Sequence, residues 1–135
     1  MTQTSTRTAT CRCGQLTTTC TGDPVRVSVC HCLVCQKRTG SAFSVQARWP
    51  EEQVIVEGRS SSWSRTADSG LTATYHFCPE CGSTVHYMTE HMPRLIAIPV
   101  GAFADPAFPA PAFSVWEERK HSWVEIGGDG VEHSD

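Results

Sequence analysis

The 135-residue sequence lacks several features that would place it in well-known functional classes. It has no apolar run of the roughly 18 residues that a membrane-spanning helix requires. Its first ten residues, MTQTSTRTAT, lack the apolar core of a signal peptide, so we expect a cytoplasmic protein. Lysine and arginine number 11 against 14 aspartate and glutamate, and without a basic excess we expect neither nucleic acid nor membrane as a partner.

Long helical patterns are also scarce, and alternating strand patterns dominate. The only helix that we expect is a turn or two from His31 to Gly40, where Lys37 and Arg38 suit the negative end of the helix. Short runs separated by turn residues predict strands. These runs cover residues 15–22, 25–29, 42–49, 53–58, 60–65, 72–77, 83–88 and 94–101, followed by SVWEE (114–118) and WVEI (123–126). The sequence therefore predicts a mainly β, antiparallel domain.

The organisation along the chain indicates one domain. We expect a disordered lead-in over residues 1–6, a single folded domain over 7–125 and a flexible acidic tail over 126–135. The proline-rich segment 104–113 reads as an extended crossing loop.

Eight cysteines in a chain expected to be cytoplasmic favour metal binding over a disulfide framework. Four of them form two close pairs, Cys11-x-Cys13 and Cys78-x-x-Cys81. Two such pairs supply the four thiolates of a closed, structural zinc site. In CPECG, Pro79 presets a turn and Gly82 lets backbone amides face the sulfurs, as in a zinc knuckle.

A second group, Cys30, Cys32 and Cys35, has no fourth cysteine at a suitable spacing. Cys20 alternates with Leu16 and Thr18 and is expected to be a small core residue. Three protein ligands and one open position are typical of catalytic zinc. Because three thiolates leave the zinc complex with a net negative charge, this group suits activation of a thiol better than activation of water.

Other interpretations of these residues remain open at this stage. His31 is an alternative fourth ligand, although on a compact turn its direction competes with that of its neighbours. A redox role for Cys32-x-x-Cys35 is disfavoured, since redox motifs of this form occur in a βαβ context. His76 and His86 flank the CPECG turn and are the histidines most expected near a site.

Taken together, these motifs resemble the family of glutathione-dependent formaldehyde-activating enzymes and centromere protein V. The shared pattern is CxCG, then CxCxxC with a downstream G-[ST]-x-F, then FCxxCG, and it covers roughly residues 7–125. The resemblance implies an Mss4-like β fold with two zinc ions. It assigns Cys11, Cys13, Cys78 and Cys81 to the structural ion and Cys30, Cys32 and Cys35 to the catalytic one.

The resemblance also implies a carbon–sulfur lyase that joins glutathione, or a similar small thiol, to formaldehyde, giving S-hydroxymethylglutathione. One departure concerns Ser114, which stands where family members commonly carry a histidine. From adjacency to the cysteines we expect His31, Gly40, Ser41 and Phe43 to shape the substrate pocket. The competing interpretation is a non-catalytic zinc module that binds a partner or acts as a chaperone.

Overall fold

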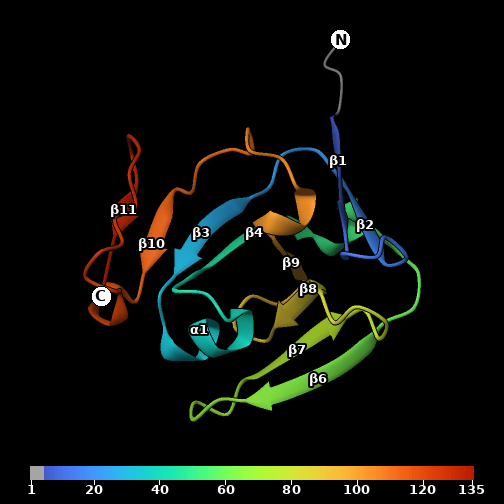
Figure 1. The fold of residues 1–135 in the computed structure, drawn as a ribbon, viewed down its shortest axis with the longest axis horizontal. Helices are drawn as coiled ribbons and strands as arrows, with labels where there is room; N and C mark the ends of the chain where they lie inside the picture. The colour runs from blue at the N-terminus through green and yellow to red at the C-terminus, as the bar shows by residue number, and fades with distance from the viewer. Residues whose placement is uncertain (1–4) are drawn as a thin grey trace.

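The computed structural model of the chain describes residues 5–135 and forms two β-sheets with one α-helix (Figure 1). The smaller sheet has the order β1-β2-β5, with β1 at Thr6–Thr10, β2 at Thr17–Thr21 and β5 at Val54–Glu57. The larger sheet has the order β11-β10-β3-β4-β9-β8-β7-β6. The predicted mainly β fold class is confirmed, with 41% of residues 5–135 in strands.

The eight strands of the larger sheet are short, as their alternating sequences predict. Their bounds are Arg26–Cys30 (β3), Ser44–Pro50 (β4), Ser61–Thr66 (β6), Thr72–Phe77 (β7), Thr84–Thr89 (β8), Leu95–Pro99 (β9), Phe113–Val115 (β10) and Glu132–His133 (β11). Most pairs are antiparallel, but β10 runs parallel to both β3 and β11. The expected antiparallel arrangement therefore holds for the other strand pairs, and this edge adds two parallel pairings.

The helix α1 spans Leu33–Thr39, as the sequence predicts, and its ends have clear causes. The Cys32 side chain accepts a hydrogen bond from the amide of Cys35 and caps the first turn, and Gly40 ends the helix with φ of 68°. Short 3₁₀ segments occur at Glu51–Gln53 (η1), Val100–Phe103 (η2) and Glu117–Arg119 (η3).

The core lies between the two sheets. Ala9, Cys20, Val27, Trp49 and Ile98 are all buried there, from strands of both sheets. The interpretation of Cys20 as a core residue is confirmed, because its side chain is fully buried in this cluster. Among residues 5–135, no helix has the length and apolar character needed to cross a membrane.

Four sequence expectations, one near the start of the chain and three near its end, differ from the structure. The lead-in falls largely outside the described residues, but Thr6 already belongs to β1, which pairs with β2. The expected strand SVWEE stops at Val115, because Trp116 adopts a left-handed φ of 58° and η3 follows, and WVEI forms no strand. Residues 132–134 of the expected flexible tail are tied to the sheet, since Glu132 and Ser134 donate their amides to Ala112 and Ser114.

Candidate metal centres and substrate groove

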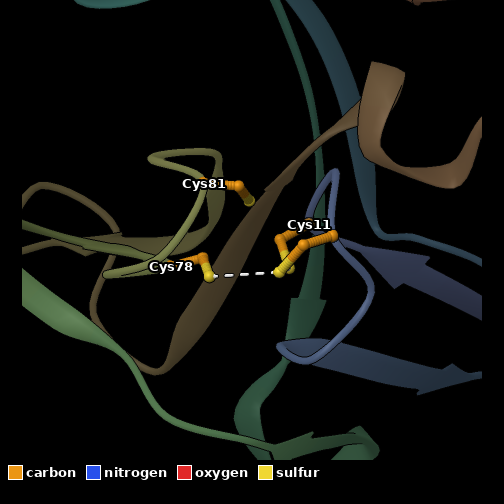
Figure 2. A group of neighbouring side chains, drawn as sticks. Cys11, Cys78 and Cys81 are labelled. Atoms are coloured by element: carbon orange, nitrogen blue, oxygen red, sulfur yellow. Dashed lines mark hydrogen bonds between the residues drawn. The ribbon is translucent and has the colours of Figure 1, made fainter.

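The first cysteine group joins the two sheets. Cys11 and Cys13 lie in the turn between β1 and β2, and Cys78 and Cys81 lie in the turn between β7 and β8. The four sulfurs are all within 4.8 Å of one another, and Figure 2 shows the labelled cysteines of the two turns facing each other. Adjacent sulfurs are 3.6 Å (Cys11 to Cys13) and 3.7 Å (Cys13 to Cys78) apart. Tetrahedral zinc with bonds of about 2.3 Å places its sulfurs about 3.8 Å apart, so this donor set fits the ion.

Hydrogen bonds to these sulfurs support the same interpretation. The amide of Leu16 donates to Cys11 Sγ over 3.3 Å, and the amide of Glu80 donates to Cys78 Sγ over 3.4 Å. Gln15 Nε2 donates to Cys78 Sγ over 2.9 Å. Donors directed at sulfur stabilise thiolates, which are the form that binds metal.

Gln15 also holds the segment between β5 and β6, which passes beside this group. Its side-chain amide bonds to both the amide and the carbonyl of Arg59, over 3.0 and 2.8 Å. The preceding Gly58 has a φ of 102°, and a Cβ there would lie 2.1 Å from the carbonyl oxygen of Gln15. Only glycine fits this close approach.

The second group, Cys30, Cys32 and Cys35, forms where β3 ends and α1 begins. Cys30 is the last residue of β3, Cys32 caps α1 and Cys35 lies in its first turn. Their sulfurs are also within 4.8 Å of one another. No fourth histidine, cysteine or acidic side chain of residues 5–135 completes this group.

Hydrogen bonds among the three sulfurs shift the pKa values of their thiols in opposite directions. Contacts from Cys30 and Cys32 lower the pKa of Cys35 to about 2, and the reciprocal contacts raise the pKa of Cys30. The guanidinium of Arg38 adds a smaller lowering effect on Cys35. A thiolate held between two neighbouring sulfurs is a ready ligand for a soft divalent cation, so this set also fits zinc. All eight cysteines of the chain are free thiols in the structure.

His31 lies between two of these cysteines but is not part of their group. Its side chain is fully buried, and Nε2 bonds to Ser114 Oγ over 2.9 Å. Because the Ser114 hydroxyl donates its proton to Glu117 over 2.6 Å, Ser114 accepts from His31 and His31 carries its proton on Nε2. Ser114, the position that departs from the family pattern, is therefore a fully buried hydrogen-bonding residue.

A groove of about 750 Å³ opens beside the second group, with Cys32 and Cys35 in its wall. Its other walls come from α1, from the β6–β7 hairpin and from the segment after β10, which contribute Arg65, Tyr75, Trp116 and Arg119 among others. A neighbouring hollow of about 400 Å³ shares Val34, Arg65 and Tyr75 with the groove and adds Lys37, Arg38 and Trp63. The guanidinium of Arg38 lies 5.1 Å from the Tyr75 ring and 4.8 Å from the Tyr87 ring, which holds it between helix and sheet.

The residues expected to shape the pocket do not line this groove. His31 is buried, Gly40 and Ser41 are exposed at the end of α1, and Phe43 packs near His31 with ring centroids 5.9 Å apart. Their contact with substrate stays a prediction. The lining residues of β6, β7 and η3 were missed because they are more than 25 residues from the cysteine motif, and no spacing pattern connects them to it.

His76 and His86, expected near a site, belong to neither cysteine group. They form a cross-strand pair whose rings stack with centroids 4.4 Å apart. They line another hollow, of about 530 Å³, which shares Thr72, Thr89 and Glu90 with the groove.

Comparison with known proteins agrees with this architecture. A crystal structure of a Rhodobacter sphaeroides protein, a structural-genomics target, superposes with a TM-score of 0.56 at 19% identity, covering 70% of this chain and 85% of the other. At that identity the likeness concerns the fold alone. No curated protein sequence matches the chain. The sequence profile described as glutathione-dependent formaldehyde-activating enzyme matches residues 6–119, and the chain belongs to this family.

Proposed function

We propose that this protein is a zinc-dependent carbon–sulfur lyase that forms or cleaves the adduct between a small thiol, such as glutathione, and a small aldehyde, such as formaldehyde. The observation that carries the proposal is the three-cysteine group in the wall of the groove. Three sulfurs lie together there without a fourth protein ligand among residues 5–135, which is the ligand count of a catalytic zinc site. The four-cysteine group would hold a second, structural zinc ion.

In the forward direction the thiol sulfur forms a bond to the aldehyde carbon. The carbonyl π pair moves to oxygen, and the proton released by the thiol ends on that oxygen, so the product is a hydroxymethyl thioether and nothing is oxidised. Zinc held by Cys30, Cys32 and Cys35 would supply stabilisation of the substrate thiolate. The reverse direction breaks the same carbon–sulfur bond.

The groove has the size and lining that a small peptide thiol needs. Its volume of about 750 Å³ lies within the usual range for small-molecule sites. Tyr75 and Trp116 offer aromatic surface, and Arg65 and Arg119 offer guanidinium groups suited to carboxylates. Glutathione carries two carboxylates, so these walls support it over an uncharged thiol. A reducing, cytoplasmic setting, which we also propose, would keep the eight cysteines available as thiols.

The decisive test replaces Cys32 with serine. Serine is a good helix cap, so Cys32→Ser keeps the hydrogen bond that starts α1 while removing one sulfur from the group. We expect the variant to fold, to bind about one zinc ion instead of two, and to lose turnover of glutathione with formaldehyde by at least roughly 100-fold. Zinc is measured by elemental analysis and turnover by NMR of the adduct.

Cys20→Ala is the matched control, because it removes a cysteine from the core and not from a metal group. It should retain two zinc ions and turnover. If Cys32→Ser turns over like the wild type, or if the wild type with two zinc ions shows no turnover with any thiol and aldehyde pair, the enzyme proposal is wrong and a non-catalytic zinc module remains.

A further inference from the structure

The loop that carries the three cysteines is held from the far end of the chain. His31, inside this loop (residues 30–35), donates its amide to the carbonyl of Val115 over 3.1 Å, next to the parallel pairing of β3 with β10. Its side chain bonds to Ser114, as described above. A separate bond runs from Gln36 Nε2 to the carbonyl of His31 over 2.8 Å. His31, the residue between Cys30 and Cys32, is thus fixed through its amide, its carbonyl and its ring.

The bond from the His31 ring continues outward through a carboxylate. Ser114 donates to Glu117 Oε2 over 2.6 Å, and His133 Nδ1 bonds to the same oxygen over 2.7 Å. Bonds from Ser114 and then from His133 lower the pKa of Glu117, so its carboxylate is charged and accepts from both. The side chains become more exposed outward along this series, from fully buried Ser114 to Glu117 at 16% and His133 at 47%.

The backbone brings these three side chains together. In the parallel pairing of β10 with β11, Ser114 lies opposite His133. The amide of Ser134 donates to the carbonyl of Ser114, and the amide of Glu117 donates to the carbonyl of Ser134, both over 2.9 Å. The last residues of the chain therefore surround Glu117 with hydrogen bonds. Among these bonds, the one that leads from Glu117 toward the cysteines runs through Ser114 to the His31 ring.

We infer that Ser114, Glu117 and His133 form a hydrogen-bonded latch that positions the three-cysteine loop for metal binding. They are positioning residues: none belongs to the cysteine group, and they act on it through the His31 ring. Groups that orient a metal-binding segment from outside the ligand set commonly change metal affinity by 10- to 100-fold when removed. The inference rests on metal binding by Cys30, Cys32 and Cys35 in the proposed function, but it requires no turnover.

The test measures zinc release from the full-length protein into a chromogenic chelator. The wild type should release zinc in two phases, a fast phase from the three-cysteine group and a slow phase from the four-cysteine group. Glu117→Gln should accelerate the fast phase by roughly 10-fold and leave the slow phase unchanged. Cobalt substitution gives a second readout, since the thiolate-to-cobalt absorption of the three-cysteine group should shift in Glu117→Gln.

Two further variants separate positioning from general destabilisation. His133 is half-exposed, so His133→Ala should fold, and it should accelerate the fast phase by roughly threefold. His133→Asn keeps a donor near the position of Nδ1 and should restore the wild-type rate. Glu118→Gln changes the exposed neighbour of Glu117 and is the matched control, with no change in either phase.

The latch is overturned if Glu117→Gln and His133→Ala release zinc at the wild-type rate, or if they accelerate both phases equally. A wild type that binds two zinc ions but shows no turnover leaves the latch testable by release and contradicts only the proposed reaction. If the wild type binds a single zinc ion and Cys32→Ser retains that ion, both the proposed reaction and the latch are contradicted.

Discussion

His86 shows how burial sets the protonation state of a single side chain. It is 9% exposed, and its Nε2 has no hydrogen-bond partner. Burial, and secondarily the charge of the stacked His76, lowers the pKa of His86 from 6.5 to about 4. The native protein therefore keeps this imidazole neutral over a range in which the unfolded chain protonates it.

We predict an acid sensitivity that belongs to His86. Because the pKa of His86 is lower in the folded state, its stability contribution is present above pH 6.5 and is lost as the pH falls toward 4. At pH 5 the loss amounts to about 2 kcal/mol of unfolding free energy relative to pH 7.5. The unfolding free energy, measured in urea at pH 7.5 and at pH 5, should decrease less in His86→Leu than in the wild type, and the difference should equal this amount.

His91→Leu is the control for this comparison, since His91 is an exposed residue of the turn after β8. The unfolding free energy of His91→Leu should decrease between pH 7.5 and pH 5 by the same amount as that of the wild type. Both variants retain the two cysteine groups, so any acid-induced loss of zinc affects them alike. An equal fall in His86→Leu and the wild type would contradict the prediction.

At the scale of elements, the groove depends on how α1 faces the β6–β7 hairpin (Figure 1). Trp63 pairs across the strands with Tyr75, and Arg65 pairs with Ala73, so alternate residues of both strands present one face. That face supplies Arg65 and Tyr75 to both the groove and the hollow beside it. Burial raises the pKa of Tyr75, and the charges of Arg38 and then Arg65 oppose that rise.

We predict that Arg65 selects thiols that carry a carboxylate. Arg65→Gln should raise KM for glutathione by about 10-fold and leave kcat nearly unchanged, because the lost contact is made equally in the ground and transition states. The KM for 2-mercaptoethanol, which has no carboxylate, should not change. Steady-state kinetics with both thiols measures the difference.

Arg59→Gln is the matched control, because the Arg59 guanidinium makes an exposed ion pair with Glu80 away from the groove. It should leave both KM values as they are. If Arg65→Gln raises the KM for glutathione and the KM for 2-mercaptoethanol equally, Arg65 shapes the groove without recognising the carboxylate.

Sequence patterns predicted the elements better than their contacts. Alternation located β2 to β9 to within a few residues, and Gly40 marked the end of α1, because both signals are local. The strand expected over 114–118 ended early, since Trp116 adopts a left-handed φ of 58°, which no local pattern of this sequence predicts. The pairing of β11 was missed for a similar reason: GGDGVEHSD is polar and glycine-rich, and only its register with β10 makes it a strand.

In the candidate site, too, local spacing predicted some residues, and contacts between distant segments determined the others. Spacing alone separated four cysteines from three, and the structure brings together those same two groups. Arg65, Trp116 and Arg119 could not be found, because the groove forms between elements distant in sequence and their residue types are common on any surface. Ser114 was noted as a departure, but its bond to His31 depends on the parallel pairing of β10 with β3.

At the scale of the whole molecule, the two cysteine groups have different mechanical roles. The four-cysteine group connects the turn of the smaller sheet to a turn of the larger one, and Cys11, Leu16, Cys78 and Val85 form a buried cluster around it. The three-cysteine group lies within one continuous segment, from β3 to α1, that hydrogen bonds and sheet pairing already hold. Loss of metal from the four-cysteine group should therefore unfold the protein, whereas loss of metal from the three-cysteine group should leave it folded.

We predict that zinc leaves in two steps with different structural consequences. A mild chelator such as EDTA should remove one equivalent from the three-cysteine group while the near-ultraviolet circular dichroism of buried Trp49 stays as in the native protein. Removal of the second equivalent should abolish that signal and the cooperative thermal transition together, because the sheets lose the link between Cys11 and Cys78. Two matched variants distinguish the sites. Cys35→Ser should keep a cooperative transition with one zinc ion, whereas Cys78→Ser should lose several kcal/mol of stability or fail to fold; the opposite pattern would mean that the three-cysteine group is the structural one.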